Sequence, residues 1–306
     1  MIRPFRSTRR QFLGQTIASG LTAAAAPLIG QRVASAADES PKLPRWQIGC
    51  WTRPWAKEDY RVAMDNTAEA GYKFIALTGA KTRTGRVIAP DTTLEESQQV
   101  GEEARKRGLQ ITSVYGGGLP LDKGPESLRK MVDNCAAAGG QSVVIAHLGN
   151  EETTGQYCKS IAECCDYAAG KSVSILLKPH GGMMGSGLLC REALQRIGHP
   201  NCSLMYDPGN IYFYSDGALN PVEDADALDG LVTAMSVKDY LPPKNVALTP
   251  GTGQVDFPAL MKRLYKGGFT HGPLAVEMVA PGDLAHTLQE AKRARQFVEE
   301  LVASVG

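Results

Sequence analysis

The segment LEESQQVGEEARKRGLQITSVYGGG, residues 94–118, contains the repeating unit that decides the fold. Its first part, 94–107, has the spacing of an amphipathic helix and is followed by Gly108, a residue type that favours helix C-termini. A short apolar run, 110–115, comes next and ends at Tyr115 and three glycines. A helix that ends at glycine and is followed at once by an apolar strand is typical of a parallel sheet.

This unit recurs along residues 46–306. Apolar runs predict eight strands, at 46–51, 73–78, 110–115, 142–147, 173–178, 202–207, 234–239 and 274–277. Helices followed by glycine are predicted at 59–70, 94–107, 126–138 and 257–266. Eight units in about 260 residues predict an α/β protein with one domain, a (β/α)8 TIM barrel. A doubly wound open sheet is the alternative, but no Gly-x-Gly-x-x-Gly follows the first strand.

The N-terminal residues have the features of an export signal. Arg9 and Arg10 precede an apolar, alanine-rich stretch at 17–29, and the small residues 34–36 follow. This order predicts a twin-arginine signal peptide at 1–36, a linker at 37–45 and the barrel domain at 46–306. The apolar stretch is short and contains Gly20 and Pro27, so we expect no stable membrane span. We expect a periplasmic or otherwise exported protein, with the twin-arginine export machinery as a partner.

Charge and cysteine content limit the partners. Five of the 33 Lys and Arg residues and none of the 32 Asp and Glu residues lie in the signal, so the mature chain carries a net charge of −4. This value argues against a nucleic-acid partner, which requires a dense basic surface. Seven cysteines lack metal-finger spacing, and folding in the reducing cytoplasm before export argues against disulfides. The oligomeric state stays open, and a homo-oligomer is compatible with the sequence.

The active site of such a barrel lies at the C-terminal ends of its strands. The residues at those positions are polar or aromatic, whereas the strand interiors are apolar: Trp51, Tyr115, His147, Lys178 with His180, Asp207 with Asn210, Lys238, and Glu277. A ring of such side chains suits a polar ligand the size of a sugar. We therefore expect a small carbohydrate substrate.

Four stretches resemble the xylose isomerase-like barrel superfamily, specifically its sugar phosphate isomerase/epimerase branch: GHPNCSLMYDPGN (198–210), SVKDY (236–240), TPGTGQVDFPAL (249–260) and PLAVEM (273–278). The resemblance implies the barrel fold and sugar isomerase or epimerase activity. It also implies one divalent metal, held by Glu, Asp, His and Glu at the ends of strands five to eight. Asp207 and Glu277 match the second and fourth of these ligands.

The other two positions depart from the family pattern. Lys178 stands where the family has glutamate, and Ser236 stands where it has histidine. A protonated lysine has no lone pair for a metal, and a serine hydroxyl is a poor substitute for imidazole. We therefore expect no cofactor, or one divalent metal held by Asp207 and Glu277. The net charge is −1 for three carboxylates around a divalent cation, and it is also −1 for one lysine between two carboxylates. Our hypothesis is a metal-free ion-paired centre of Lys178, Asp207 and Glu277.

The sequence thus predicts an exported carbohydrate isomerase or epimerase that removes a proton next to a carbonyl. Glu277 is the expected base, Lys178 the expected group that stabilises the enediolate, and His180 a proton shuttle. The expected substrate-binding residues are Asp207, Asn210, His147, Tyr115, Trp51, Lys238 and Ser236. Two alternatives stay open: a lyase or hydrolase of oxidised glycosides on the same scaffold, and a non-catalytic periplasmic sugar-binding protein.

The stretch at 251–256 follows the seventh predicted strand, where barrels often bind phosphate through backbone amides. We interpret Asp256 as the N-cap of the helix at 257–266 and expect a free sugar or glycoside, because an exported protein seldom meets sugar phosphates. Lys238 and Asp239 are interpreted as an ion pair that orients this loop.

Overall fold

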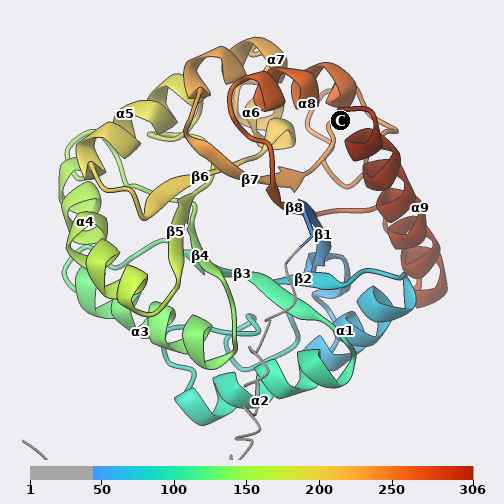
Figure 1. Cartoon of the computed structure of the whole chain (residues 1–306), viewed down its shortest axis with the longest axis horizontal. Helices are drawn as coiled ribbons and strands as arrows, with labels where there is room; N and C mark the ends of the chain where they lie inside the picture. Colours follow the sequence, from blue (N-terminus) through green and yellow to red (C-terminus); the bar gives the residue numbers. More distant parts are fainter. Residues whose placement is uncertain (1–43, 306) are drawn as a thin grey trace, which may run out of the picture. The chain divides into compact units, whose positions relative to one another are not determined.

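The computed structural model describes residues 44–305, which form one closed barrel of eight parallel strands surrounded by helices (Figure 1). Each strand pairs with the next, and β8 closes the ring against β1. The strands are β1 (Trp46–Trp51), β2 (Phe74–Leu77), β3 (Gln110–Gly117), β4 (Ser142–Ile145), β5 (Ser174–Leu177), β6 (Cys202–Tyr206), β7 (Val232–Val237) and β8 (Gly272–Val276). The predicted (β/α)8 barrel is confirmed. The predicted signal peptide and most of the predicted linker lie outside the described residues.

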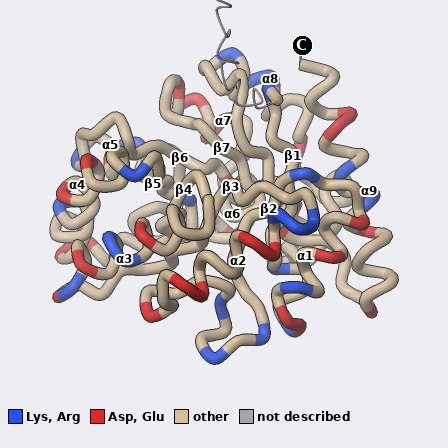
Figure 2. The backbone as a smooth tube through the Cα atoms, turned by 60° about the horizontal axis from the view of Figure 1, so that its bottom comes forward, with Lys and Arg blue, Asp and Glu red and all other residues tan. Residues whose placement is uncertain are grey.

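The outer ring contains long helices between most strands and shorter ones near β1 and β7. They are η1 (Arg53–Trp55), α1 (Tyr60–Glu69), α2 (Leu94–Lys106), α3 (Gly124–Ala137), α4 (Thr154–Gly170), α5 (Gly187–Ile197), α6 (Pro208–Tyr214), α7 (Pro221–Asp224), η2 (Ala225–Leu228), α8 (Phe257–Lys266) and α9 (Leu284–Ala303). The predicted bounds agree with these strands and helices to within two residues. Along the outer helices, basic and acidic residues are interspersed (Figure 2).

Alternation along the strands divides the apolar residues into two layers. The larger core lies between the strands and the helices and includes all seven cysteines, which are buried and free. A separate cluster fills the barrel interior: Trp51, Ala76, Val144, Leu176, Met205, Ala234 and Ala275, with Tyr115 packed against it. Leu176, Met205 and Ala275 each lie two residues before a charged residue at a strand end. The inner cluster therefore lies directly below the charged side chains at the strand ends, inside the barrel.

Within the part of the chain that is described, no helix has the length and apolar character needed to cross a membrane.

Candidate active site

A cavity of about 320 Å³ opens at the C-terminal ends of the strands. Its lining comes from the ends of β1, β2, β3, β5 and β8 and the loops that follow them: Trp51, Arg53, Ala56, Thr78, Gly79, Tyr115, Lys178, His180 and Glu277. Five of the ten residues predicted for the site therefore line this cavity, among them the three predicted catalytic residues. The cavity is large enough for a monosaccharide.

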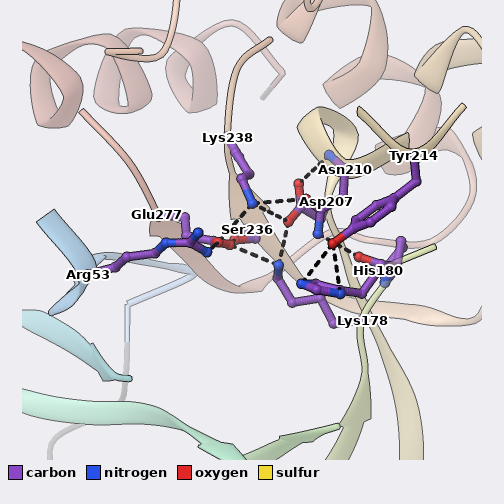
Figure 3. Close-up of polar contacts among 10 residues, drawn as sticks. Arg53, Lys178, His180, Asp207, Asn210, Tyr214, Ser236, Lys238 and Glu277 are labelled. Carbon is purple, nitrogen blue, oxygen red and sulfur yellow. Dashed lines mark hydrogen bonds and ion pairs between the residues drawn. The ribbon is translucent and has the colours of Figure 1, made fainter. Parts of the chain in front are cut away.

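Lys178 lies between two carboxylates at the base of the cavity (Figure 3). Its Nζ is 2.5 Å from Oδ2 of Asp207 and 2.9 Å from Oε2 of Glu277. All three side chains are buried, with exposed fractions of 4% or less. The structure thus brings together the three residues of the hypothesised ion-paired centre.

Glu277 accepts contacts from four donors. Arg53 Nη1 lies 2.6 Å and Lys238 Nζ 2.9 Å from Oε1. Ser236 donates to Oε2 at 2.6 Å, beside the contact from Lys178. Because each carboxylate oxygen has two donors, Glu277 has little capacity left to accept a proton or bind a ligand.

These charges fix the protonation states. Burial alone would raise the pKa of Glu277, but Lys178, Lys238 and Arg53 outweigh it and hold that pKa well below its ordinary value. Burial would lower the pKa of Lys178, yet Asp207 and Glu277 raise it above the ordinary value. Glu277 is therefore a carboxylate and Lys178 an ammonium at neutral pH.

Asn210, Lys238 and Ser236 lie behind this centre and outside the cavity lining. Asn210 accepts a hydrogen bond from Lys238 at 2.9 Å and donates to the Pro179 carbonyl at 2.7 Å. A side chain at Gly209 would approach Lys238 to 2.8 Å, so glycine lets the lysine reach the centre. The structure gives Asn210, Lys238 and Ser236 contacts that position Asp207, Glu277 and the loop after β5.

His180 lines the cavity in the loop after β5, and its imidazole contacts Tyr214 (Figure 3) and His147. The Tyr214 hydroxyl lies 2.9 Å from Nδ1, and the His147 ring packs edge-on with a centroid separation of 4.6 Å. Burial, and then the charge of Lys178, lower the pKa of His180 to about 4. His180 is therefore neutral at neutral pH. His147 is exposed at the rim.

Arg53 is a site residue that the sequence pattern did not predict. It lies two residues beyond the end of β1, in η1, and its guanidinium lines the cavity with 44% of the side chain exposed. Its position in the loop after the first strand could have indicated a role in the site, because the loops that follow the strands form the active sites of barrels.

Lys238 and Asp239 do not form the predicted ion pair. Lys238 contacts Glu277, whereas the Asp239 carboxylate accepts backbone N–H groups of Tyr240, Gly251, Gly253 and Val255 at 2.7 to 3.2 Å. Asp239 still orients the loop before α8, but through amides. Asp256 caps α8 as predicted, accepting from the amide of Ala259.

The residues present do not fit the divalent metal that the resemblance implies. Lys178 Nζ lies between the carboxylates of Asp207 and Glu277, the two acids that match the family's metal ligands. Residues 44–305 contain no group of three or more His, Cys, Asp and Glu side chains that could hold a metal. Two carboxylates already bound by ammonium and guanidinium groups offer few of the oxygen or imidazole ligands that divalent cations require.

Solved structures share this fold at low sequence identity. A xylose isomerase domain protein from Planctomyces limnophilus is 17% identical with a TM-score of 0.69, over 86% of this chain and 99% of that one. An L-ribulose 3-epimerase is 15% identical with a TM-score of 0.66, over 84% and 95%. A D-allulose 3-epimerase from Methylomonas sp. is 19% identical with a TM-score of 0.67, over 85% and 99%.

None of the curated proteins matches this sequence. A family model described as xylose isomerase-like TIM barrel matches residues 64–301, which include β2 to β8 and the ion-paired centre at their ends. The chain therefore belongs to the xylose isomerase-like TIM barrel family.

Proposed function

We propose that this protein is an exported carbohydrate isomerase or epimerase, of the family's isomerase/epimerase branch, that transfers a proton next to a carbonyl without a metal. The observation that carries the proposal is the Lys178 ammonium, held at the base of the cavity by Asp207 and Glu277 and adjacent to neutral His180. The structural neighbours named as 3-epimerases support the reaction class.

Lys178 stabilises the intermediate in this mechanism. An ammonium has three N–H donors, and Asp207 and Glu277 occupy two of them. The third donates to the carbonyl oxygen of the substrate, on which negative charge develops when the neighbouring carbon loses its proton. The two carboxylates keep Lys178 charged and oriented, so the donor is in place before the reaction begins.

His180, rather than Glu277, is the proposed base. It lines the cavity, it is neutral, and an imidazole nitrogen can take the proton from carbon. The electron pair of the broken C–H bond forms the enediolate. The imidazolium then returns the proton to the adjacent carbon while the hydroxyl proton moves between the two oxygens, or water protonates the original carbon on the opposite face and the imidazolium loses its proton to solvent. The first outcome is isomerisation and the second is epimerisation. The Tyr214 hydroxyl orients the ring.

The exported location rests on the N-terminal pattern of Arg9, Arg10, the apolar stretch at 17–29 and residues 34–36. We propose that the twin-arginine machinery delivers the folded barrel to the periplasm. A fusion of residues 1–45 to a reporter that is active only after export tests this step. Export should cease when both arginines are replaced by lysine, and continued export would contradict it.

Incubation in deuterium oxide tests the reaction directly. A panel of aldoses, ketoses and sugar acids is incubated with the protein, and deuterium on carbon is measured by mass spectrometry. We expect exchange for at least one sugar and its loss in Lys178→Met, whereas Lys130→Met, a surface lysine paired with Glu126, keeps it. Binding without exchange would favour the non-catalytic sugar-binding protein, and cleavage of a keto-glycoside would favour the lyase or hydrolase.

A further inference from the structure

We infer that the substrate is a sugar acid, bound through its carboxylate by Arg53 at the mouth of the cavity. This inference rests on the proposed function for the place where the substrate binds, and it names the chemical class of that substrate. The acceptors of the site are already occupied, whereas several of its donors are open.

The acceptors of the centre are occupied. Both oxygens of Glu277 accept two donors each, as described above. Asp207 receives Lys178 on Oδ2 and the backbone amide of Asn210 on Oδ1. Each hydroxyl of a neutral sugar has a donor as well as acceptor lone pairs, and these two carboxylates leave those donors little to bind.

The donors, by contrast, remain open. The Arg53 guanidinium has five N–H donors. Among residues 44–305, it makes one hydrogen bond, from Nη1 to Glu277, so most of its donors are open. Lys178 keeps one N–H, and the buried indole N–H of Trp51, a lining residue, has no partner in the described part of the chain. A ligand that supplies acceptors satisfies all three groups.

The charge of the centre points the same way. Arg53, Lys178 and Lys238 carry three positive charges, and Asp207 and Glu277 carry two negative ones, so the net charge is +1. Both lysines are 3% exposed, and water therefore screens this excess weakly. The partly exposed guanidinium of Arg53 is the group of the three that reaches solvent, and its planar fork matches a carboxylate.

A phosphate fits this site less well than a carboxylate. The loop after β7, where barrels often bind phosphate with backbone amides, directs the amides of Gly251, Gly253 and Val255 to the Asp239 carboxylate. The Asp239 carboxylate thus occupies the amides that would otherwise bind a phosphate. Arg53 follows β1 and is separated from this loop by β8.

Calorimetric titration tests the inference with two matched ligand pairs, D-glucuronate with D-glucose and D-galacturonate with D-galactose, and with D-glucose 6-phosphate. We expect at least one acid to bind about tenfold or more tightly than its neutral partner. Arg53→Gln should weaken binding of that acid by about 10- to 100-fold, the range for loss of a charge-assisted contact, and leave neutral sugars unchanged. Arg83→Gln is the control, because Arg83 is 75% exposed and pairs with Asp91.

Equal affinity within both pairs, no binding of either acid, or unchanged binding by Arg53→Gln would overturn the inference. Preference for the phosphate over both acids would also overturn it. The proposed function fails separately: acid binding without deuterium exchange contradicts the reaction and keeps the ligand class. Deuterium exchange with neutral sugars, without any preference for acids, supports the reaction and contradicts the ligand class.

Discussion

Lys178 and Glu277 form a buried ion pair whose desolvation is offset by further contacts. An unpaired charge in such a place is strongly unfavourable, and burying even a paired one costs several kcal/mol. Here Glu277 contacts Lys178, Lys238, Arg53 and Ser236. Each charge in this centre therefore stabilises the others, and removal of one leaves the remainder uncompensated.

Replacing Lys178 with methionine should lower the free energy of unfolding by about 3 to 5 kcal/mol, because two buried carboxylates lose a shared cation. Urea denaturation measures this change. Lys130→Met removes an exposed pair with Glu126 and should change the free energy by less than about 1 kcal/mol. Equal stability of the two variants would show that Lys178 is not part of a coupled centre.

The protonation of His180 predicts the pH dependence of catalysis. Its pKa is lowered to about 4, so the neutral base is present above that pH and kcat/KM should fall as pH drops through about 4. His180→Gln should reduce kcat/KM by about 100-fold or more. His271→Gln alters a histidine at the start of β8, away from the cavity, and should have no effect. An acidic limb near pH 6.5 would contradict the assignment.

For individual residues, the position of a side chain at a strand end was predictable from the sequence. The residues that it contacts were not predictable. Lys178 and Glu277 directly follow the last residues of β5 and β8, so their place at the barrel mouth follows from the sequence. Arg53 lies beyond a strand end, and its contact with Glu277 joins residues 224 apart in the sequence. Nothing local in the sequence indicates which of several strand-end acids such an arginine will meet.

At the scale of elements, the loop between β7 and α8 depends on one carboxylate. Asp239 binds four backbone amides, and a side chain at Gly253 would come within 2.2 Å of its Oδ1, so this position requires glycine. The glycines and Asp256 of this stretch were visible in the sequence. Asp239 was predicted to orient the loop as an ion pair with Lys238, because adjacent opposite charges suggest a pair, although neighbouring residues of a strand point to opposite faces.

Asp239→Asn should lower the free energy of unfolding by about 2 kcal/mol or more, because an amide nitrogen replaces an oxygen that accepts two N–H groups. Hydrogen exchange at Gly251 and Gly253 should accelerate. Asp256→Asn is the matched control, since asparagine caps a helix about as well as aspartate, and it should change the free energy by less than about 0.5 kcal/mol. Equal protection of the loop in both variants would contradict this role.

At the scale of the whole molecule, the barrel was predictable because eight similar units repeat the same signals. The short elements between β6 and β7, which are α6, α7 and η2, were not predicted, because segments of four to seven residues carry little periodicity. The ring of charges at the barrel mouth is a property of closure. It exists because β8 pairs with β1 and so brings Arg53 to Glu277.

We propose that Lys178 performs the electrostatic role of a metal in this member of the family. The most direct test measures deuterium exchange by protein dialysed against EDTA, with bound metals determined by plasma mass spectrometry on the same sample. We predict that exchange continues at an unchanged rate with less than about 0.1 metal ion per chain, because an ammonium already lies between the two carboxylates. Loss of exchange on dialysis, and its recovery with added Mn²⁺ or Mg²⁺, would contradict the claim.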